Sequence, residues 1–521
     1  MQVTVRKRLI AFFVAGIPAL VAGCGRPAGN SDGADHYSTA GETIVRGLGG
    51  EPETLNPVLA DDNAALTLLQ DLFDGLTTEA ADGSLVPGAA GSWTISPDSL
   101  RWTFALRPDL HWSNDDPLTA AHFVAGLERA RDPASKAPYA ELLAPIHAVR
   151  APDARTLVIE LSRPMPHLAA VLALPLAGPV HSPQDAVDGT ITNGPYRVLA
   201  RRPGENIELV RNDRFHAADA VAIEHVTYLT LDDINTELNL YRSGHLDVTS
   251  EVPNSQIEWL RQNLPGELHI APYLSTYAYA VNLARVRDRD ARMALAMAID
   301  RQQITARVTG AGEIAATSWV PPGIPGYAPS RFEWADLPTE KRSEHARALW
   351  QAASERGATL AQLTLCTDAS ANHRRTAVAL VDQWHRTLGV EVTIVEMEWK
   401  AYLAMREQPG ECDLVRFGWS ADFVDPAAFL ALFASGHAQN VAGYSNRAYD
   451  ALLSQAAMAA DADQRAELLA SAERILLQDA VVIPIFHRVS KRLVKPGIEG
   501  IAANPLGHLP SRYLRVHATK K

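Results

Sequence analysis

The segment Gly418-Trp419-Ser420-Ala421-Asp422-Phe423-Val424-Asp425-Pro426 decides how this chain is interpreted. The apolar stretch 413–417 directly before it predicts a strand. Asp425-Pro426 then opens a predicted helix over 426–433, because aspartate is a good N-cap and proline suits the first helical position. Since Asp425 caps that helix, the carboxylate of Asp422 is left at the turn without a capping role. The segment therefore predicts a strand, a turn that carries Asp422, and a capped helix.

The alternation of strands and helices continues on both sides of this segment. Predicted helices cover 63–73, 119–131, 232–243, 290–308, 371–388, 399–406 and 463–478. Predicted strands cover 43–46, 101–106, 157–161, 207–210, 225–231, 245–248, 363–366 and 390–397. This order predicts an α/β fold with largely parallel sheets, in which ligands bind beyond the carboxyl ends of the strands.

Length and composition indicate a globular protein of several lobes. The chain has 521 residues, of which 47% are hydrophobic and 21% charged, which is enough for two or three compact lobes. Its formal net charge is −12, and no basic stripe with interleaved aromatic residues is present. An acidic chain repels phosphate backbones, so we expect no nucleic-acid partner.

The first 24 residues have the organisation of a lipoprotein export signal. The cationic run Arg6-Lys7-Arg8 precedes an apolar stretch over 9–20, which is shorter than the roughly 20 residues that span a bilayer. Val21-Ala22-Gly23-Cys24 then resembles a lipobox, so residues 1–23 are predicted to be a signal peptide and Cys24 the lipidated residue. The alternative is a signal anchor with an incidental cysteine. Residues 24–41 are predicted to be a flexible tether.

Two further cysteines, Cys366 and Cys412, lie outside any CxxC pair or histidine cluster, so no metal site is predicted. We expect buried free thiols, although an oxidising compartment also allows a disulfide. Catalytic signatures of the GxSxG, P-loop, HExxH and GxGxxG types are absent from the sequence. The chain is therefore expected to bind a ligand rather than to be an enzyme, and no cofactor is predicted.

Six other segments accompany the Gly418–Pro426 motif in a fixed order. They are 51–57 (Glu-Pro-Glu-Thr-Leu-Asn-Pro), 107–117 with His-Trp-Ser-Asn-Asp, 193–197 (Asn-Gly-Pro-Tyr-Arg), 240–247, 296–301 and 320–323. Together they resemble the large solute-binding proteins of dipeptide and oligopeptide ABC importers, solute-binding protein family 5, over residues 43–516. The resemblance implies a three-lobed α/β periplasmic binding protein in which two lobes close over a central cleft. Lobe I would comprise 42–62, 190–274 and 489–521, lobe II 63–189 and lobe III 275–488, with hinge crossings near Ser275 and Arg488.

The resemblance also implies which residues bind a peptide. Asp422 would receive the ammonium terminus with help from Asp61, whereas Arg416, Arg406, His373 and Arg285 would receive the carboxylate. Arg285 replaces a lysine common in the family. Trp399, Tyr139 and Tyr273 resemble the aromatic lining, and Trp419 of the motif is counted with them. Each of these side chains could instead have an ordinary role in packing or solvation.

Two departures from the family pattern are present. Phe486-His487-Arg488 stands where the family often has a run of tyrosines, so a pocket near the start of the peptide is expected to differ in shape and polarity. Ser275 and Ser420 occupy positions where relatives can carry a cysteine pair.

The resemblance implies a receptor that delivers short oligopeptides to an ABC importer permease. The first 24 residues add a lipid anchor in the periplasm or cell envelope, and we expect a monomer. A dipeptide, a murein peptide, nickel or haem is the alternative cargo on the same scaffold. A lipid-anchored envelope enzyme or a chaperone-like envelope protein is the alternative of another class.

Overall fold

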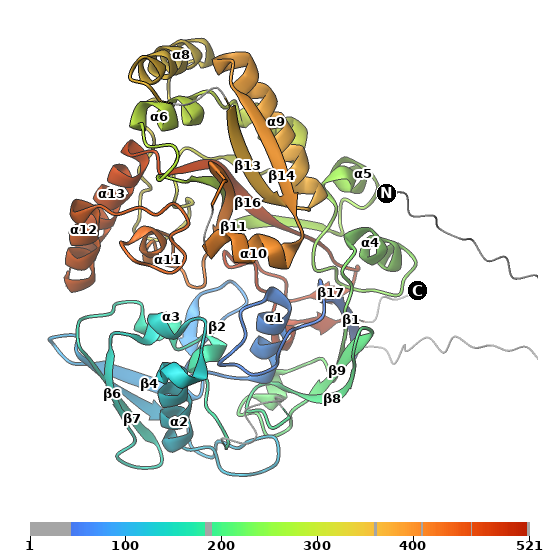
Figure 1. The fold of residues 1–521 in the computed structure, drawn as a ribbon. Coiled ribbons are helices and arrows are strands. Elements are labelled where there is room, and N and C mark those ends of the chain that lie inside the picture. The colour runs from blue at the N-terminus through green and yellow to red at the C-terminus, as the bar shows by residue number, and fades with distance from the viewer. Residues whose placement is uncertain (1–42, 183–189, 359–361, 408–409, 460, 518–521) are drawn as a thin grey trace, which may run out of the picture. The chain divides into compact units, whose positions relative to one another are not determined.

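The computed structural model describes residues 43–182, 190–358, 362–407, 410–459 and 461–517 (Figure 1). These residues belong to one compact unit. The predicted signal peptide, Cys24 and the tether lie outside the described residues. Among the described residues, no helix is long and apolar enough to cross a membrane.

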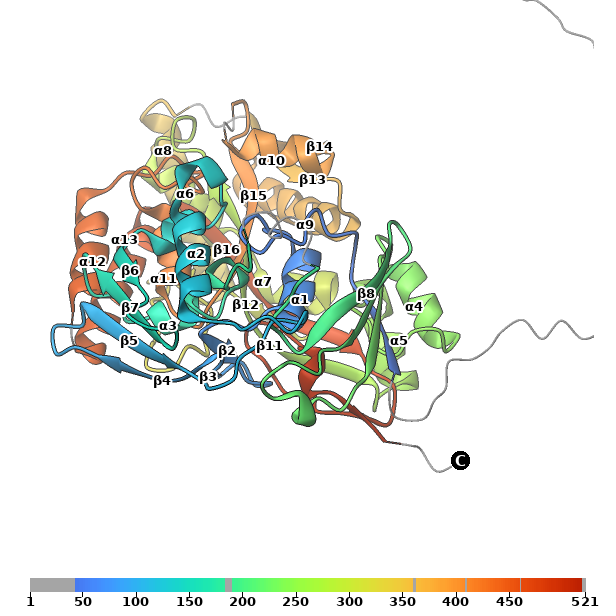
Figure 2. The same cartoon turned by 90° about the horizontal axis from the view of Figure 1, so that it is seen from below.

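The first sheet combines the first strand of the described chain with three later ones. Its order is β1 (Thr43–Gly47), β10 (His225–Leu229), β9 (Asn206–Arg211) and β8 (Tyr196–Arg202). β1 and β10 are parallel, and the other two pairings are antiparallel. α4 (Ile234–Arg242) and α5 (Ile257–Asn263) lie beside this sheet in Figures 1 and 2, and α1 (Asn63–Leu72) contacts β8.

The second sheet is antiparallel throughout. Its order is β4 (Ala90–Ile95), β5 (Arg101–Leu106), β7 (Thr156–Leu161) and β6 (Ile146–Arg150), and β2 (Thr77–Glu79) forms a separate hairpin with β3 (Leu85–Pro87). β5 shows the predicted alternation, because Trp102, Phe104 and Leu106 are buried while Arg101 and Ala105 are exposed. α2 (Ala120–Arg131) packs on β6 and β7, and the short helix α3 (Leu168–Val171) contacts β2.

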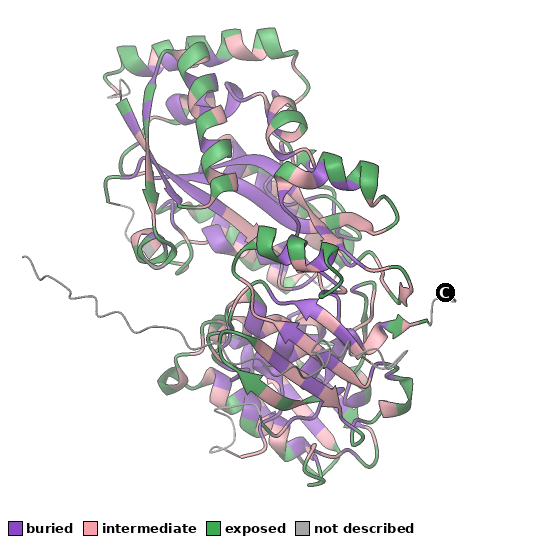
Figure 3. Cartoon of the chain, turned by 90° about the vertical axis from the view of Figure 1, so that its right-hand side faces the viewer, coloured by how far each residue is buried: buried purple, intermediate pink, exposed green. Residues whose placement is uncertain are grey.

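The third sheet is the largest. Its order is β12 (Ile314–Ala315), β16 (Val482–Leu493), β11 (Leu268–Val281), β15 (Leu414–Ser420), β13 (Gln362–Asp368) and β14 (Glu391–Met397). Its helices are α6 (Arg289–Met297), α7 (Arg301–Ile304), α8 (Thr339–Glu355), α9 (Ala371–Leu388), α10 (Trp399–Glu407), α11 (Ala427–Leu430), α12 (Arg447–Met458) and α13 (Ala462–Gln478). In Figure 3 the central strands are buried and the helices expose their outer faces.

The α/β class is confirmed, but the prediction of largely parallel sheets is wrong. Among the described strands, only β1–β10, β13–β14 and β13–β15 pair in parallel. β4–β5 and β8–β9 are joined by short turns, and such turns connect only antiparallel neighbours. The single helix predicted over 290–308 is also wrong. Asp300 accepts a hydrogen bond from Gln303 N at 2.9 Å and starts α7 as a new helix, and a π-helical turn, Thr305–Thr309, follows it.

Two long strands, β11 and β16, connect the first sheet with the third. They pair antiparallel over most of their length, and isolated bridges Arg46–Val248 and Val248–Val494 link the end of β16 to β1. The register of the pair shifts between Pro272 and Thr276, at the place where the sequence predicts the hinge crossing. The limits of the three lobes remain a prediction.

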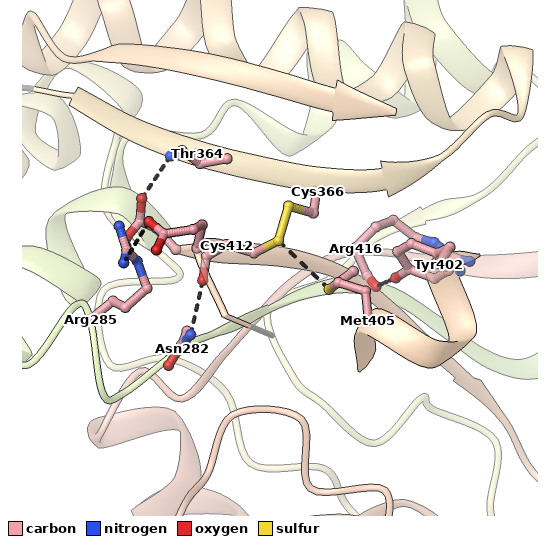
Figure 4. The surroundings of a disulfide bond; sticks show 10 residues. Asn282, Arg285, Thr364, Cys366, Tyr402, Met405, Cys412 and Arg416 are labelled. Carbon is pink, nitrogen blue, oxygen red and sulfur yellow. Dashed lines mark hydrogen bonds and ion pairs between the residues drawn. A yellow bond between two sulfur atoms is a disulfide. The ribbon is translucent and has the colours of Figure 1, made fainter. Parts of the chain in front are cut away.

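A disulfide joins Cys366 of β13 to Cys412, with 5.8 Å between their Cα atoms (Figure 4). The expectation of free thiols is therefore wrong. The two residues lie 46 positions apart in sequence but close in space, because Cys412 lies two residues before β15 and β15 pairs in parallel with β13 at Leu365–Leu414. The sulfur of Cys412 also lies 3.6 Å from the sulfur of Met405, so the disulfide contacts α10.

Replacing both cysteines by serine should lower the free energy of unfolding by about 4 kcal/mol, because the bond restricts a loop of about 46 residues in the unfolded chain. Urea unfolding of the oxidised parent, the reduced parent and the double variant measures this difference. The reduced parent and the variant should agree. Equal stability of oxidised and reduced parent would contradict the assignment of a stabilising bond.

Candidate functional site

Asp422 follows β15 and has a partly buried carboxylate without a partner. In the described part of the chain, no hydrogen bond or ion pair joins it to another residue. Burial raises the pKa of Asp422 to about 6, and the charge of His508 opposes this shift. Leaving a carboxylate desolvated and unpaired is costly, so this group is suited to a cationic ligand.

The predicted residue Tyr139 lies near Asp422 and near Asp61. Burial raises the pKa of Tyr139, and the charges of Asp422 and Asp61 raise it further, so both carboxylates lie near its ring. Burial and the neighbouring charges of Glu53 and Asp62 raise the pKa of Asp61. Tyr139 is thus the residue that both Asp422 and Asp61 influence.

Tyr273 belongs to the same region. Burial raises the pKa of Tyr273, and the charge of Asp422 raises it further. A hydrogen bond with Ser420 and the charge of Arg488 act in the opposite direction. Ser420 Oγ lies 3.0 Å from Ser275 Oγ, so the two serines that replace a cysteine pair in relatives are neighbours across β11 and β15.

One edge of β15 lacks a strand partner near Asp422. β15 pairs with β11 along its whole length, whereas β13 accompanies it only at Leu414 and Val415. Beyond Val415, the side of β15 that faces away from β11 has no neighbouring strand among the described residues.

The phase of the hydrogen bonding shows which main-chain groups lie on that edge. Ala421 N donates to Leu274 O at 2.8 Å, so residue 421 faces β11. Because antiparallel bonding alternates along a strand, the N–H and C=O groups of Gly418 and Ser420 face the opposite way. In the described part of the chain these groups have no hydrogen-bond partner. We call them the free β15 edge, and an extended peptide can add to it as a further strand.

Arg416 and His373 both bind Asp368, which ends β13. Arg416 Nη2 lies 2.9 Å from Asp368 Oδ1, and His373 Nδ1 lies 2.8 Å from the same oxygen. Despite burial, the hydrogen bond from His373 and the charge of Arg416 lower the pKa of Asp368 to about 2. Burial and the charges of Arg416 and Arg488 lower the pKa of His373 to about 4, so His373 is neutral at pH 7. The cluster therefore has almost no net charge.

Arg406 of α10 has no carboxylate partner in the described residues. Its Nη2 donates to Gln439 Oε1 at 3.1 Å, its Cζ lies 5.2 Å from the Phe417 ring centroid, and its Nε is buried without a hydrogen bond. Burial lowers the pKa of Arg406, and the charge of Arg416 lowers it further. An anion near Arg406 would supply the missing compensation.

The two predicted tryptophans differ in environment. Trp399 is 50% exposed and stacks on Tyr402, with 5.9 Å between ring centroids. Trp419 lies in β15, and its indole Nε1 is buried without a hydrogen-bond partner. Trp399 thus presents an open aromatic face, whereas Trp419 is packed.

Arg285 does not join the other predicted cations. It pairs with Asp413 at 2.7 Å and with Glu411 at 3.3 Å, so two carboxylates already compensate it. Figure 4 places Arg285 on the other side of the disulfide from Arg416 and Tyr402. The structure therefore separates Arg285 from the remainder of the predicted site.

The described residues contain no group of three or more histidine, cysteine or carboxylate side chains that could hold a metal ion.

Comparison with known proteins identifies the family. The model described as bacterial extracellular solute-binding proteins, family 5 Middle, matches residues 84–440. This chain is a family 5 solute-binding protein. The match confirms the family expected from the sequence. It also agrees with the α/β fold of this chain.

Curated relatives extend over nearly the whole solute-binding protein. The periplasmic oligopeptide-binding protein OppA of Escherichia coli K12 is 32% identical over 506 residues, covering 91% of this chain and 92% of OppA. The probable deoxycholate-binding periplasmic protein YgiS of the same organism is 34% identical over 496 residues, covering 90% of this chain and 92% of YgiS. The solved structure of the E. coli murein tripeptide binding protein MppA has a TM-score of 0.84 at 31% identity, covering 92% of this chain and 99% of MppA.

Reasoning from the sequence of this binding protein missed two residues of the site. Asp368 compensates the charge of Arg416. The sequence contained a clue to this role, because Asp368 follows a predicted strand and the carboxyl ends of strands line ligand sites. Tyr402 donates to the carbonyl oxygen of Arg416 and lies 5.2 Å from its guanidinium carbon. Its spacing of four residues from Arg406 on one helix was the available signal.

Asp368→Asn should lower the free energy of unfolding by about 3 kcal/mol at pH 7, because it leaves the buried charge of Arg416 uncompensated. The folded pKa of about 2 lies below the ordinary value of 3.8, so the stabilisation is present above pH 4 and is lost as the pH falls toward 2. Urea unfolding at several pH values measures the difference.

Asp382→Asn is the matched control, since Asp382 is 60% exposed and pairs with Arg386 on the surface of α9. It should cost about 0.5 kcal/mol or less. A loss for Asp368→Asn no larger than that of the control would contradict the compensating role.

Proposed function

We propose that this chain is the extracytoplasmic substrate-binding lipoprotein of an ABC importer, and that it captures short oligopeptides and delivers them to a membrane permease. In this proposal it acts by binding alone, as a monomer anchored in the cell envelope through Cys24. Lobes I and III close on the peptide about hinges near Ser275 and Arg488.

The observation that carries the proposal is the unpaired carboxylate of Asp422 at the end of the free β15 edge. A peptide combines an ammonium group with main-chain amides and a terminal carboxylate. Asp422 compensates the ammonium, with Asp61 and Tyr139 beside it. The main-chain groups of Gly418 and Ser420 hydrogen-bond to the peptide amides, which does not depend on the peptide's side chains. Arg406 binds the terminal carboxylate.

The other predicted residues have supporting roles. Arg416 with Asp368 and His373 forms a polar wall, in which Arg416 can direct a remaining N–H at the ligand. Trp399 and Tyr273 provide aromatic surfaces that bury area at a small cost in side-chain entropy, and Trp419 holds the edge strand in place. Arg285 is assigned no contact with a peptide bound in this way.

The relatives' names support a peptide more than the alternative cargoes. OppA and MppA are named for an oligopeptide and a murein tripeptide, and both ligands have the zwitterionic ends that Asp422 and Arg406 require. YgiS is named for deoxycholate, an anion without an ammonium group. A lone anion would leave Asp422 uncompensated, so that cargo fits this chain less well.

Purified mature protein should bind free peptides, and Asp422→Asn should weaken that binding about tenfold or more, because a charge-assisted hydrogen bond to the ammonium is lost. N-acetylated peptides should bind the parent equally weakly. Binding to the parent should also weaken below pH 6, since protonation of Asp422 removes the charge that attracts the ammonium.

Isothermal titration calorimetry with paired free and acetylated tripeptides measures these effects, and native mass spectrometry detects peptides that co-purify. Asp382→Asn, the same chemical change on an exposed surface, should bind like the parent. Equal binding of free and acetylated peptides would refute the role of Asp422. The absence of any peptide binding would refute the proposed function.

The anchoring proposal has a separate test. Cys24→Ser should move the protein from the membrane fraction to the released fraction, because the thiol is the site of lipid attachment. Immunoblotting of fractionated cells measures the distribution. A membrane-bound serine variant would contradict the lipoprotein assignment, and the peptide-binding proposal would be unaffected.

A further inference from the structure

Arg488 is a second guanidinium of the binding region that has no carboxylate partner. It belongs to β16, and in the described part of the chain no ion pair or hydrogen bond of its side chain is present. Its Cζ lies 5.5 Å from the Tyr277 ring centroid, which is a cation–π contact. The sequence predicted a changed pocket at this position but assigned Arg488 only to the hinge.

The β-bulge between β11 and β16 explains why Arg488 faces the site. His487 pairs with Thr276 and Val489 pairs with Pro272, so Arg488 lies opposite the extra residues of the bulge. Bulges redirect a side chain from its regular alternation. A Cβ built on Gly418 would lie 3.8 Å from Arg488 Nη2, which places the guanidinium beside Gly418 of β15.

The titrating neighbours of Arg488 confirm this location. Its charge opposes the rise in the pKa of both Tyr273 and Tyr277 and contributes to the lowered pKa of His373. The guanidinium therefore lies between Tyr273, near the ammonium end, and the cluster around Asp368.

The nearby carboxylates are already committed to other groups. Asp368 compensates Arg416, and Glu251, which acts on Tyr273, lies 3.7 Å from Lys491. His508, which lowers the pKa of Asp422, is bound by Glu79 at 2.8 Å. None of these carboxylates is bonded to Arg488.

The site thus holds two guanidinium groups without a carboxylate, Arg406 and Arg488, whereas a peptide has one terminal carboxylate. We propose that Arg488 is a specificity-determining residue that selects peptides with an acidic side chain. This inference rests on the proposed function and names the chemical class of its cargo. An aspartate or glutamate side chain would bind the guanidinium fork beside Gly418 while the peptide main chain pairs with the β15 edge.

The test compares tripeptides of alanine that carry one glutamate or one glutamine at each of the three positions. At one position the parent should bind the glutamate peptide about tenfold more tightly, as expected for one charge-assisted hydrogen bond. Arg488→Gln should reduce this ratio to about one, and Arg488→Lys should retain part of it because the charge remains. Calorimetry measures the affinities, and thermal unfolding checks that each variant is folded.

Arg285→Gln is the matched control, since it removes the same charge from an arginine that two carboxylates already compensate. It should keep the parent's preference for glutamate. A parent that binds glutamine and glutamate peptides equally at all positions would overturn the inference and leave the proposed function intact. An equal loss of both peptides in Arg488→Gln would also overturn it, because Arg488 would then bind the terminal carboxylate. If no peptide binds the parent, the proposed function fails and the inference fails with it.

Discussion

The antiparallel pairing of β11 with β16 is the constraint on which the rest of the structure depends. These two strands carry the chain from the first sheet into the third and form the centre of the third sheet. Several predicted binding groups lie on this pair or on its neighbour β15: Tyr273 belongs to β11, and Arg416 and Trp419 belong to β15. Asp422 follows β15, which lies against β11, and Arg488 projects from the bulge in β16. A displacement of the pair would therefore move both ends of the site together.

Charge compensation separates the structural polar groups from those available to a ligand. Asp74 is buried and bound by Arg512 at 3.0 Å, and Asp368 is bound by Arg416 at 2.9 Å. Asp422, in contrast, is partly buried and has no ion-pair partner among the residues that the structure describes. Isolated buried charges are expensive, so a folded chain keeps them only where another molecule completes the pair. The peptide proposed above would supply the partner that Asp422 lacks.

Local sequence predicted the features that depend on short segments. α9 begins at Ala371 and ends before Gly389 as expected, and the motif around Asp422 was correctly interpreted as a strand followed by a capped helix. Features that depend on distant segments were predicted less well. The Cys366–Cys412 bond requires knowledge that β13 and β15 are neighbours, and the isolation of Arg285 depends on carboxylates 126 and 128 residues away. Sequence spacing contains no direct information on such pairings.

The free β15 edge has a consequence for how receptors of this kind diversify. Main-chain groups recognise any extended backbone, so the edge can stay the same while the choice of cargo changes through a few side chains around it. Single substitutions of those side chains can therefore change the cargo without rebuilding the fold. Gene duplication followed by a few such changes would yield a set of receptors that share one architecture and bind different ligands.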